Sequence, residues 1–211
     1  MRSTMTTNFT KAEINAIYGT IRQFLYFLAT FAFVLLINII AKHYKAATFE
    51  EYSIIENMQL YILLSAGIVF FVNTLHYPHM RSISFLLASF CFFATCRELD
   101  SFFHKLIPII SWKFGYFFPL LAGIFACLTF RSTLKSALQF LTSPSFFMMC
   151  CAVIIILPIA QCIGHRPLIV SVLGPRNVAN IKQLFEECCE LIGYFLILLS
   201  SIEYNINFHK K

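Results

Sequence analysis

Long apolar stretches separated by short polar segments dominate the pattern of this 211-residue chain. A helix needs about 20 residues, at 1.5 Å per residue, to cross the roughly 30 Å hydrocarbon layer of a bilayer. Backbone polar groups inside lipid must be satisfied within the segment itself, which favours helices. The pattern therefore predicts six membrane-spanning helices, at about 23–41, 54–74, 82–101, 112–130, 140–163 and 184–203.

Composition supports the same class of protein. Hydrophobic residues make up 59% of the chain and charged residues 12%, against about 25% charged residues in soluble domains. One soluble core of this size could not bury so much apolar surface, whereas lipid can cover it. The predicted fold is all-α: a polytopic six-helix bundle without a soluble domain, preceded by a short N-terminal segment (1–22) and followed by a short C-terminal tail (204–211).

The formal charge of +6 is scattered along the chain, with no dense Lys/Arg run. This distribution argues against nucleic acid as a partner and leaves membrane lipids as the expected one. Six spans place both termini on one side of the membrane. Eight Lys/Arg residues fall on each side, but most of the acids lie opposite the termini. Unpaired positive charge therefore remains on the terminal side, so we expect cytoplasmic termini.

Three of the predicted spans are too short to cross the bilayer without their charged ends. The apolar run 191–202 gives only about 18 Å of helix, so the sixth span must include Glu186, Glu187 and Glu190. Arg81 and Arg97 bracket about 22 Å of helix in the third span, which draws the turn from Arg97 to Asp100 to the membrane boundary. The second span brings Glu56 and Gln59 toward the apolar zone in the same way.

Helical spacing gathers these polar residues into stripes on the same side of the membrane. Glu187, Glu190, Tyr194 and Ser201 share one face of the sixth helix, and Glu56, Gln59 and Asn73 align on the second. On the third helix the expected stripe is Arg97, Asp100 and His104, with Glu98 turned elsewhere. We expect the three stripes to converge into one site in which Arg97 is the counter-charge to the carboxylates.

A purely structural interpretation accounts for part of this pattern. Acids suit the N-terminus of a helix and bases suit its C-terminus, because they complement the helix dipole. Charged side chains near a membrane boundary can also extend to the headgroups. Against this interpretation, ionisable residues inside spans are costly and usually mark function.

The first functional hypothesis is a cation- or proton-handling site. Carboxylate oxygens are ligands for Ca²⁺, Mg²⁺ or Mn²⁺ and also for Zn²⁺, so a divalent cation is the expected cofactor. The candidate metal ligands are Glu56, Asp100, Glu186 and Glu190, with Gln59, His104 and Tyr194 as supporting polar groups. Carboxyls in such a setting could also couple to protons.

Two other classes remain open. An intramembrane lipid hydrolase could use Glu187 or Glu190 as a general base, with Arg97 holding an oxyanion or phosphate and Asp100 as a further catalytic candidate. A non-catalytic membrane subunit or scaffold would instead use Arg97–carboxylate pairs to fix helix register. The residue pattern does not decide whether the chain is an enzyme.

Three short motifs carry a resemblance to a known group of proteins. Glu56-Asn-Met-Gln59, Arg97-Glu-Leu-Asp100 and Glu186-Glu-x-x-Glu190 together resemble small, uncharacterised bacterial multi-pass inner-membrane proteins. The resemblance covers most of the chain and implies a location in the bacterial inner (plasma) membrane. It implies no activity.

Overall fold

The computed structural model describes residues 10–44, 54–99, 117–129, 133–163 and 178–209, together with the single positions 165, 167, 170 and 171. Its regular structure within these ranges consists of helices, without strands. Among the described residues, four helical stretches are long and apolar enough to cross a membrane: Glu13–His43, Ile54–His76, Pro78–Glu98 and Pro144–Ile163. The prediction of an all-helical membrane protein is therefore confirmed in outline.

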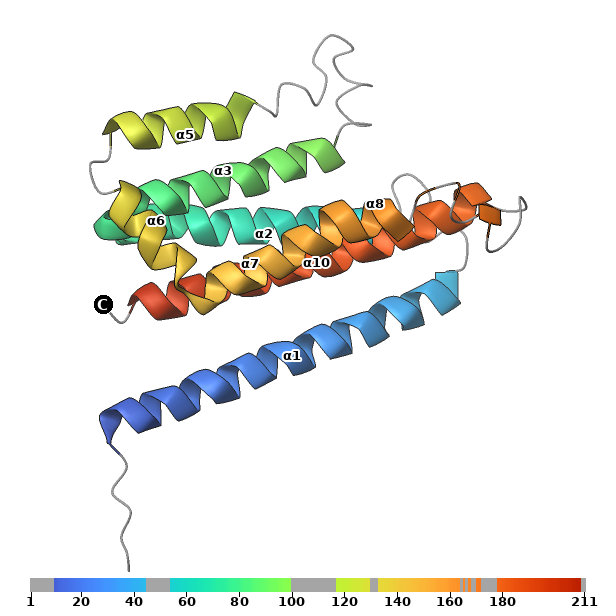
Figure 1. Cartoon of the computed structure of the whole chain (residues 1–211). Coiled ribbons are helices and arrows are strands. Elements are labelled where there is room, and N and C mark those ends of the chain that lie inside the picture. Colours follow the sequence, from blue (N-terminus) through green and yellow to red (C-terminus); the bar gives the residue numbers. More distant parts are fainter. Residues whose placement is uncertain are drawn as a thin grey trace, which may run out of the picture.

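The main helices alternate in direction along the bundle (Figure 1). They are α1 (Lys11–Tyr44), α2 (Ile54–His76), α3 (Arg81–Glu98), α5 (Phe117–Thr129), α6 (Thr133–Leu141), α7 (Pro144–Ile154), α8 (Ala160–Ile163) and α10 (Val178–His209), with the short helices η2 (Pro78–Met80) and η4 (Ile155–Ile159). We call the end where α1 begins and α2 and α10 finish the termini end. At the opposite, distal end, α2 and α10 begin and α3 finishes.

The predicted fifth span begins later than expected. Phe140 and Leu141 belong to α6, and α7 starts at Pro144. Ser143 is the N-cap of α7, where its side chain accepts a hydrogen bond from the Phe146 backbone N–H. Proline is favoured in the first turn of a helix because it has no N–H to leave unpaired there. The Ser-Pro pair therefore marks the start of α7 within an otherwise continuous apolar run.

A π-helical segment lies where α7 continues past Pro158. Proline cannot donate the hydrogen bond that an α-helix needs, and one wider turn accommodates this defect. The five residues of η4 make that turn, and α8 restores the α-helix. Gly193 of α10 packs against this region: a Cβ at Gly193 would collide with Ile156 and approach the Ala152 carbonyl oxygen to 3.2 Å.

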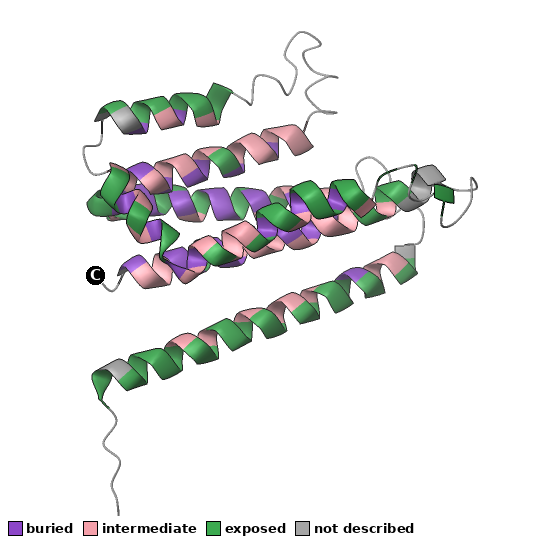
Figure 2. Ribbon diagram, viewed as in Figure 1, coloured by how far each residue is buried: buried purple, intermediate pink, exposed green. Residues whose placement is uncertain are grey.

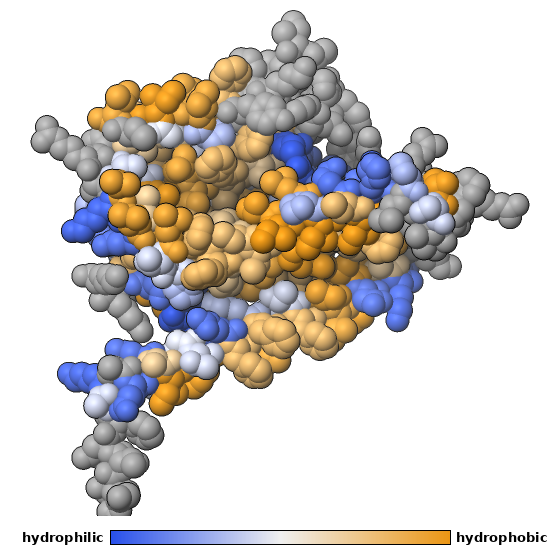
Figure 3. All heavy atoms as spheres, in the orientation of Figure 1, coloured by the Kyte–Doolittle hydropathy of each residue, from blue (hydrophilic) through white to orange (hydrophobic). Residues whose placement is uncertain are grey.

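Buried side chains concentrate on α2, α3 and α10, whereas α1 is exposed along nearly its whole length (Figure 2). Ile37 is the one buried side chain among those of α1 that the structure describes. The surface between the polar ends is mainly apolar (Figure 3), as expected for helices covered by lipid.

Hydroxyl pairs join the helices inside the bundle. The Ser84 and Tyr204 hydroxyls are 2.7 Å apart, and those of Ser145 and Ser200 are 3.0 Å apart. Such pairs are typical contacts between membrane helices, where water cannot satisfy the polar groups. α10 continues to His209, and Tyr204 and Phe208 are buried in the core. The segment predicted as a C-terminal tail is therefore helical as far as His209, and its side chains are packed as far as Phe208.

Candidate functional site

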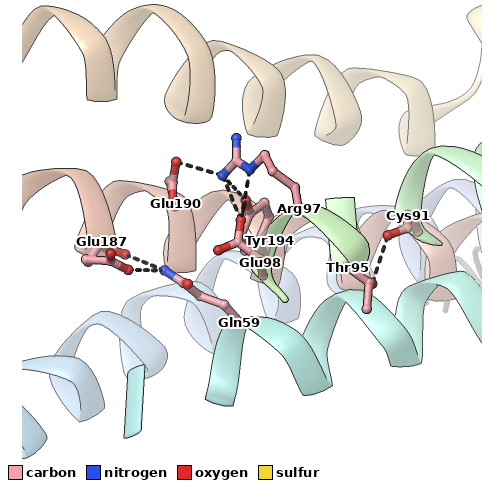
Figure 4. Close-up of polar contacts among 8 residues, drawn as sticks. All are labelled: Gln59, Cys91, Thr95, Arg97, Glu98, Glu187, Glu190 and Tyr194. Atoms are coloured by element: carbon pink, nitrogen blue, oxygen red, sulfur yellow. Dashed lines mark hydrogen bonds and ion pairs between the residues drawn. The ribbon is translucent and has the colours of Figure 1, made fainter. Parts of the chain in front are cut away.

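Arg97 lies at the centre of a charged cluster at the distal end, in the last turn of α3 (Figure 4). Its Nη2 donates to Glu98 Oε1 at 2.7 Å and to Glu190 Oε1 at 2.9 Å. Its Nε donates to the same Glu98 oxygen at 3.1 Å. Arginine suits this position because its planar guanidinium presents several donors to neighbouring carboxylates at once. The guanidinium thereby joins α3 to α10.

Tyr194 completes the cluster one turn farther along α10. Its hydroxyl accepts a hydrogen bond from Arg97 Nη2 at 2.8 Å and donates one to Glu98 Oε1 at 2.6 Å. Helical side chains lean toward the N-terminus of their helix, so this hydroxyl reaches back toward the level of Glu190. The side chain is only 2% exposed. The cluster is thus closed by a hydrogen-bonded ring rather than by a simple ion pair.

Gln59 and Glu187 form a second, adjoining contact between α2 and α10. The buried Gln59 Nε2 donates to Glu187 Oε2 at 2.8 Å and to the Glu187 backbone carbonyl at 3.2 Å. Among the described residues, Gln59 Oε1 has no hydrogen-bond partner, although Gln59 is completely buried. A buried carbonyl oxygen without a hydrogen bond costs free energy, so a hydrogen-bond donor beside Gln59 Oε1 would stabilise the site.

The cluster holds more negative than positive charge. Glu98 and Glu190 share Arg97, while Glu187 is bonded to the neutral Gln59. Glu56, Glu98 and Glu190 all interact electrostatically with Glu187. The described cluster therefore presents several carboxylates to one guanidinium.

The structure places the other predicted site residues in different ways. Glu186 pairs with Lys182, with Oε1 3.5 Å from Nζ, one turn away on α10. Glu56 is half-buried in the first turn of α2. Asp100 and His104 lie outside the described residues. In the described ranges, no three His, Cys, Asp or Glu side chains are grouped closely enough to hold a metal ion.

The expectation that Glu98 turns away from the Arg97 stripe is wrong. Consecutive helical residues differ by about 100° in direction, so the two side chains leave α3 on different faces. Arg97, however, is long enough to fold back toward Glu98, and Tyr194 of α10 contacts both side chains. The position of α10 brings Tyr194 to both Arg97 and Glu98, and the periodicity of α3 alone does not predict this contact.

A second charged pair lies toward the termini end and was not predicted. Arg22 of α1 donates from Nη2 to Glu203 Oε1 at 2.6 Å, and its Nε lies 2.6 Å from Glu203 Oε2. Asn207 also donates to Glu203 Oε1, at 2.9 Å. Glu203 is completely buried, so its charge depends on these partners. One sequence signal existed: alternation of the spans places Arg22 and Glu203 on the same side.

No family model, curated protein or solved structure matches this chain. The evidence for the candidate site is therefore its geometry.

Proposed function

We propose that this chain is a multi-pass membrane protein whose distal cluster binds a proton, or another small cation, at Glu187. Arg97, Glu98, Glu190 and Tyr194 form the fixed polar frame of that site, and Gln59 positions the binding carboxyl. The proposal keeps the cation- or proton-handling hypothesis and favours a proton over a divalent metal.

The observation that carries the proposal is the contact between Gln59 and Glu187. An amide and a neutral carboxylic acid can exchange two hydrogen bonds, one N–H to carboxyl oxygen and one O–H to amide oxygen. The hydrogen bond from Gln59 Nε2 to Glu187 Oε2 is present at 2.8 Å, and Gln59 Oε1 has no donor among the described residues. A proton on Glu187 supplies that donor and removes one uncompensated negative charge from the cluster.

The hydrolase alternative receives less support from the geometry. An oxyanion- or phosphate-binding Arg97 would need free donors aimed at a substrate. Two of its three nitrogens, Nη2 and Nε, are instead directed at Glu98, Glu190 and Tyr194, which leaves only Nη1 for a substrate. The scaffold alternative explains the Arg97 frame, but it gives no reason for the unpaired oxygen of Gln59.

The proposal also includes the finer topology. α5 and α10 would supply the fifth and sixth spans beside the four candidate stretches, and this even number would place both termini on one side of the membrane. In our proposal the chain lies in a bacterial inner membrane and that side is the cytoplasm, because unpaired positive charge favours it. The alternating helix directions in Figure 1 support this arrangement.

Infrared difference spectroscopy of the purified protein in lipid tests the proton site. A protonated carboxyl has a carbonyl stretching band that a carboxylate lacks. We expect such a band to appear on acidification, to disappear in Glu187→Gln, and to persist in Glu13→Gln, which alters an exposed acid at the start of α1. Identical spectra in the wild-type protein and Glu187→Gln would refute the proposal.

Elemental analysis of the same samples separates a proton from a metal. Stoichiometric divalent metal in the wild-type protein, lost in Glu190→Gln, would replace the proton by a metal ion. The expected result is no bound metal in either protein.

A further inference from the structure

The contacts between α2 and α10 show which residues of the two helices lie at the same level along the bundle. Gln59 contacts Glu187 and Tyr77 contacts Asn205, and both pairs are separated by 128 residues in the sequence. The two helices therefore run parallel and in one register. By the same offset, Ala66 lies level with Tyr194, and Asn73 lies level with Ser201.

α3 runs antiparallel to α10, and its contacts likewise show which of its residues lie level with those of α10. Arg97 contacts Glu190 near the distal end, and Ser84 contacts Tyr204 near the termini end. The three helices therefore carry polar contacts at both ends of their shared interface. About 16 Å of α10 separates Glu190 from Ser201.

Apolar side chains fill this interval. They belong to one continuous hydrophobic core and are at most 9% exposed: Leu63, Ala66, Phe70, Ala88, Cys91 and Ile197. We call these six residues the apolar plug. The polar groups at this level are turned away from it: the Tyr194 hydroxyl reaches back to Glu98, Ser200 bonds Ser145 of α7, and Thr95 bonds the Cys91 carbonyl of its own helix.

The charged cluster is partly exposed. The side chains of Arg97, Glu190 and Glu98 are 36%, 17% and 11% exposed, whereas Glu203 beyond the plug is completely buried. Among the described residues, Glu56 of α2, Glu98 of α3 and Glu190 of α10 interact electrostatically with Glu187. Arg97 and Glu186 interact in the same way with Glu190, and Lys182 lies one turn farther out on α10. All of these lie on the distal side of the plug.

Two buried polar side chains lie beside the apolar plug, one on each side of it. Gln59, completely buried, points its amide into the cluster from the distal side of the plug. Asn73, 1% exposed, lies on the other side, and among the described residues its Nδ2 has no hydrogen-bond partner. Polar groups thus flank the plug on both sides without meeting across it.

We infer that the distal site exchanges its cation with the solution at the distal face alone, because the apolar plug seals it from the termini end. In this conformation, the occupancy of the site follows the proton or cation concentration on one side of the membrane, and the protein does not conduct the ion across it. An apolar segment of this length offers a charge neither ligands nor hydrogen-bond partners. The nature of the bound cation rests on the function proposed above, whereas the one-sided access rests on packing alone.

Cysteine accessibility in vesicles tests the access. In a background without native cysteines, Glu190→Cys reports on the site, and Ser201→Cys reports on the level beyond the plug. A cysteine at Lys211 identifies the termini face. The probe is a membrane-impermeant cationic thiosulfonate, applied to one face at a time. We expect Glu190→Cys to react from the distal face only, and Ser201→Cys to show no reaction from that face.

Two outcomes would overturn the inference: modification of Ser201→Cys from the distal face, or of Glu190→Cys from the termini face. Glu98→Cys and Asn73→Cys serve as second reporters on the two sides of the plug if a first variant fails to fold. Proton flux gives an independent reading in liposomes that hold a pH dye and carry an imposed potassium potential. We expect the wild-type protein to pass no more protons than protein-free liposomes, and a clear protein-dependent flux would also overturn the inference.

These results are separable from the test of the proposed function. Absence of a Glu187 carboxyl band would end the proton proposal without affecting the labelling pattern. Labelling from both faces would end the one-sided access and leave proton binding at Glu187 intact.

Discussion

At the scale of single residues, the properties of Arg97 depend on having several partners at once. A lone guanidinium near the hydrocarbon boundary would be costly, and a single carboxylate would satisfy only part of its donor set. Glu98, Glu190 and Tyr194 together accept hydrogen bonds from two of its three nitrogens, Nε and Nη2. The residue therefore fixes the distal ends of α3 and α10 relative to each other.

Replacement of this guanidinium tests the frame. Arg97→Lys keeps the charge but loses the planar set of donors, so we expect a loss of about 1–2 kcal/mol in unfolding free energy. The value is below that of a fully buried pair because Arg97 is 36% exposed and partly screened. Thermal unfolding in detergent measures the loss. Arg97→Gln and Glu190→Gln should show non-additive effects when combined, and additive effects would contradict a direct pair.

At the scale of helices, α1 is held to the rest of the molecule by few contacts. Its ring contact is between Phe33 and Phe195, whose centroids are 4.1 Å apart, and its ion pair is between Arg22 and Glu203. Most of its large apolar side chains face outward. α1 therefore depends on the Glu203 pair more than the tightly packed helices α2 and α3 depend on any single contact.

Removal of the Glu203 charge should loosen α1. Glu203→Gln leaves the half-buried Arg22 without its counter-charge, which we expect to cost about 2 kcal/mol. A disulfide between Phe33→Cys and Phe195→Cys, in a background without native cysteines, reports the distance between α1 and α10. Cross-linking should fall in Glu203→Gln and stay unchanged in Glu13→Gln. Equal cross-linking in both variants would show that the ion pair is dispensable.

The contact between α10 and η4 depends on the missing side chain of Gly193. Gly193→Ala should destabilise the protein by about 1–3 kcal/mol, because the added Cβ meets Ile156. Gly19→Ala, on α1, is the matched control, since a Cβ there has nothing within 4 Å. Alanine normally stabilises a helix relative to glycine, so this control should be neutral or slightly stabilising. Recovery of stability in Gly193→Ala/Ile156→Ala would confirm the contact.

At the scale of the whole molecule, two polar ends enclose an apolar middle. The described helices place Arg97 and Glu187 at the distal end and Glu203 toward the termini end, with the plug between them. This division follows from the bilayer, which tolerates charges where they can reach the boundary or find a partner.

The proposed six-span arrangement predicts that both termini lie on the same side of the membrane. Single cysteines at Thr7 and Lys211 should react with an impermeant thiol reagent from one face, and a cysteine at Glu51 should react from the other. Intact vesicles of known orientation provide the measurement. Opposite labelling of Thr7→Cys and Lys211→Cys would require an odd number of spans.

The composition and the lengths of the apolar runs predicted the class of the protein. Span length predicted that Glu187, Glu190, Arg97 and Gln59 gather at one end of the bundle, because the apolar runs beside them are too short to cross a bilayer alone. Helical spacing then gave the shared face of Glu187, Glu190 and Tyr194. The helix start at Ser143 and Pro144 was not predicted, because hydropathy alone placed the beginning of the fifth span at about residue 140.

The tertiary structure alone decided which polar groups meet. Periodicity fixes the direction of a side chain around its own helix, but not the rotation and register of that helix against its neighbours. The shared register of α2 and α10 brings Gln59 to Glu187, and the packing of α3 on α10 brings Glu98 into the Arg97 frame. The same packing fills the interval between Tyr194 and Ser201 with apolar side chains. These relations come from side chains on separate helices that fit together, and no single segment of the sequence contains them.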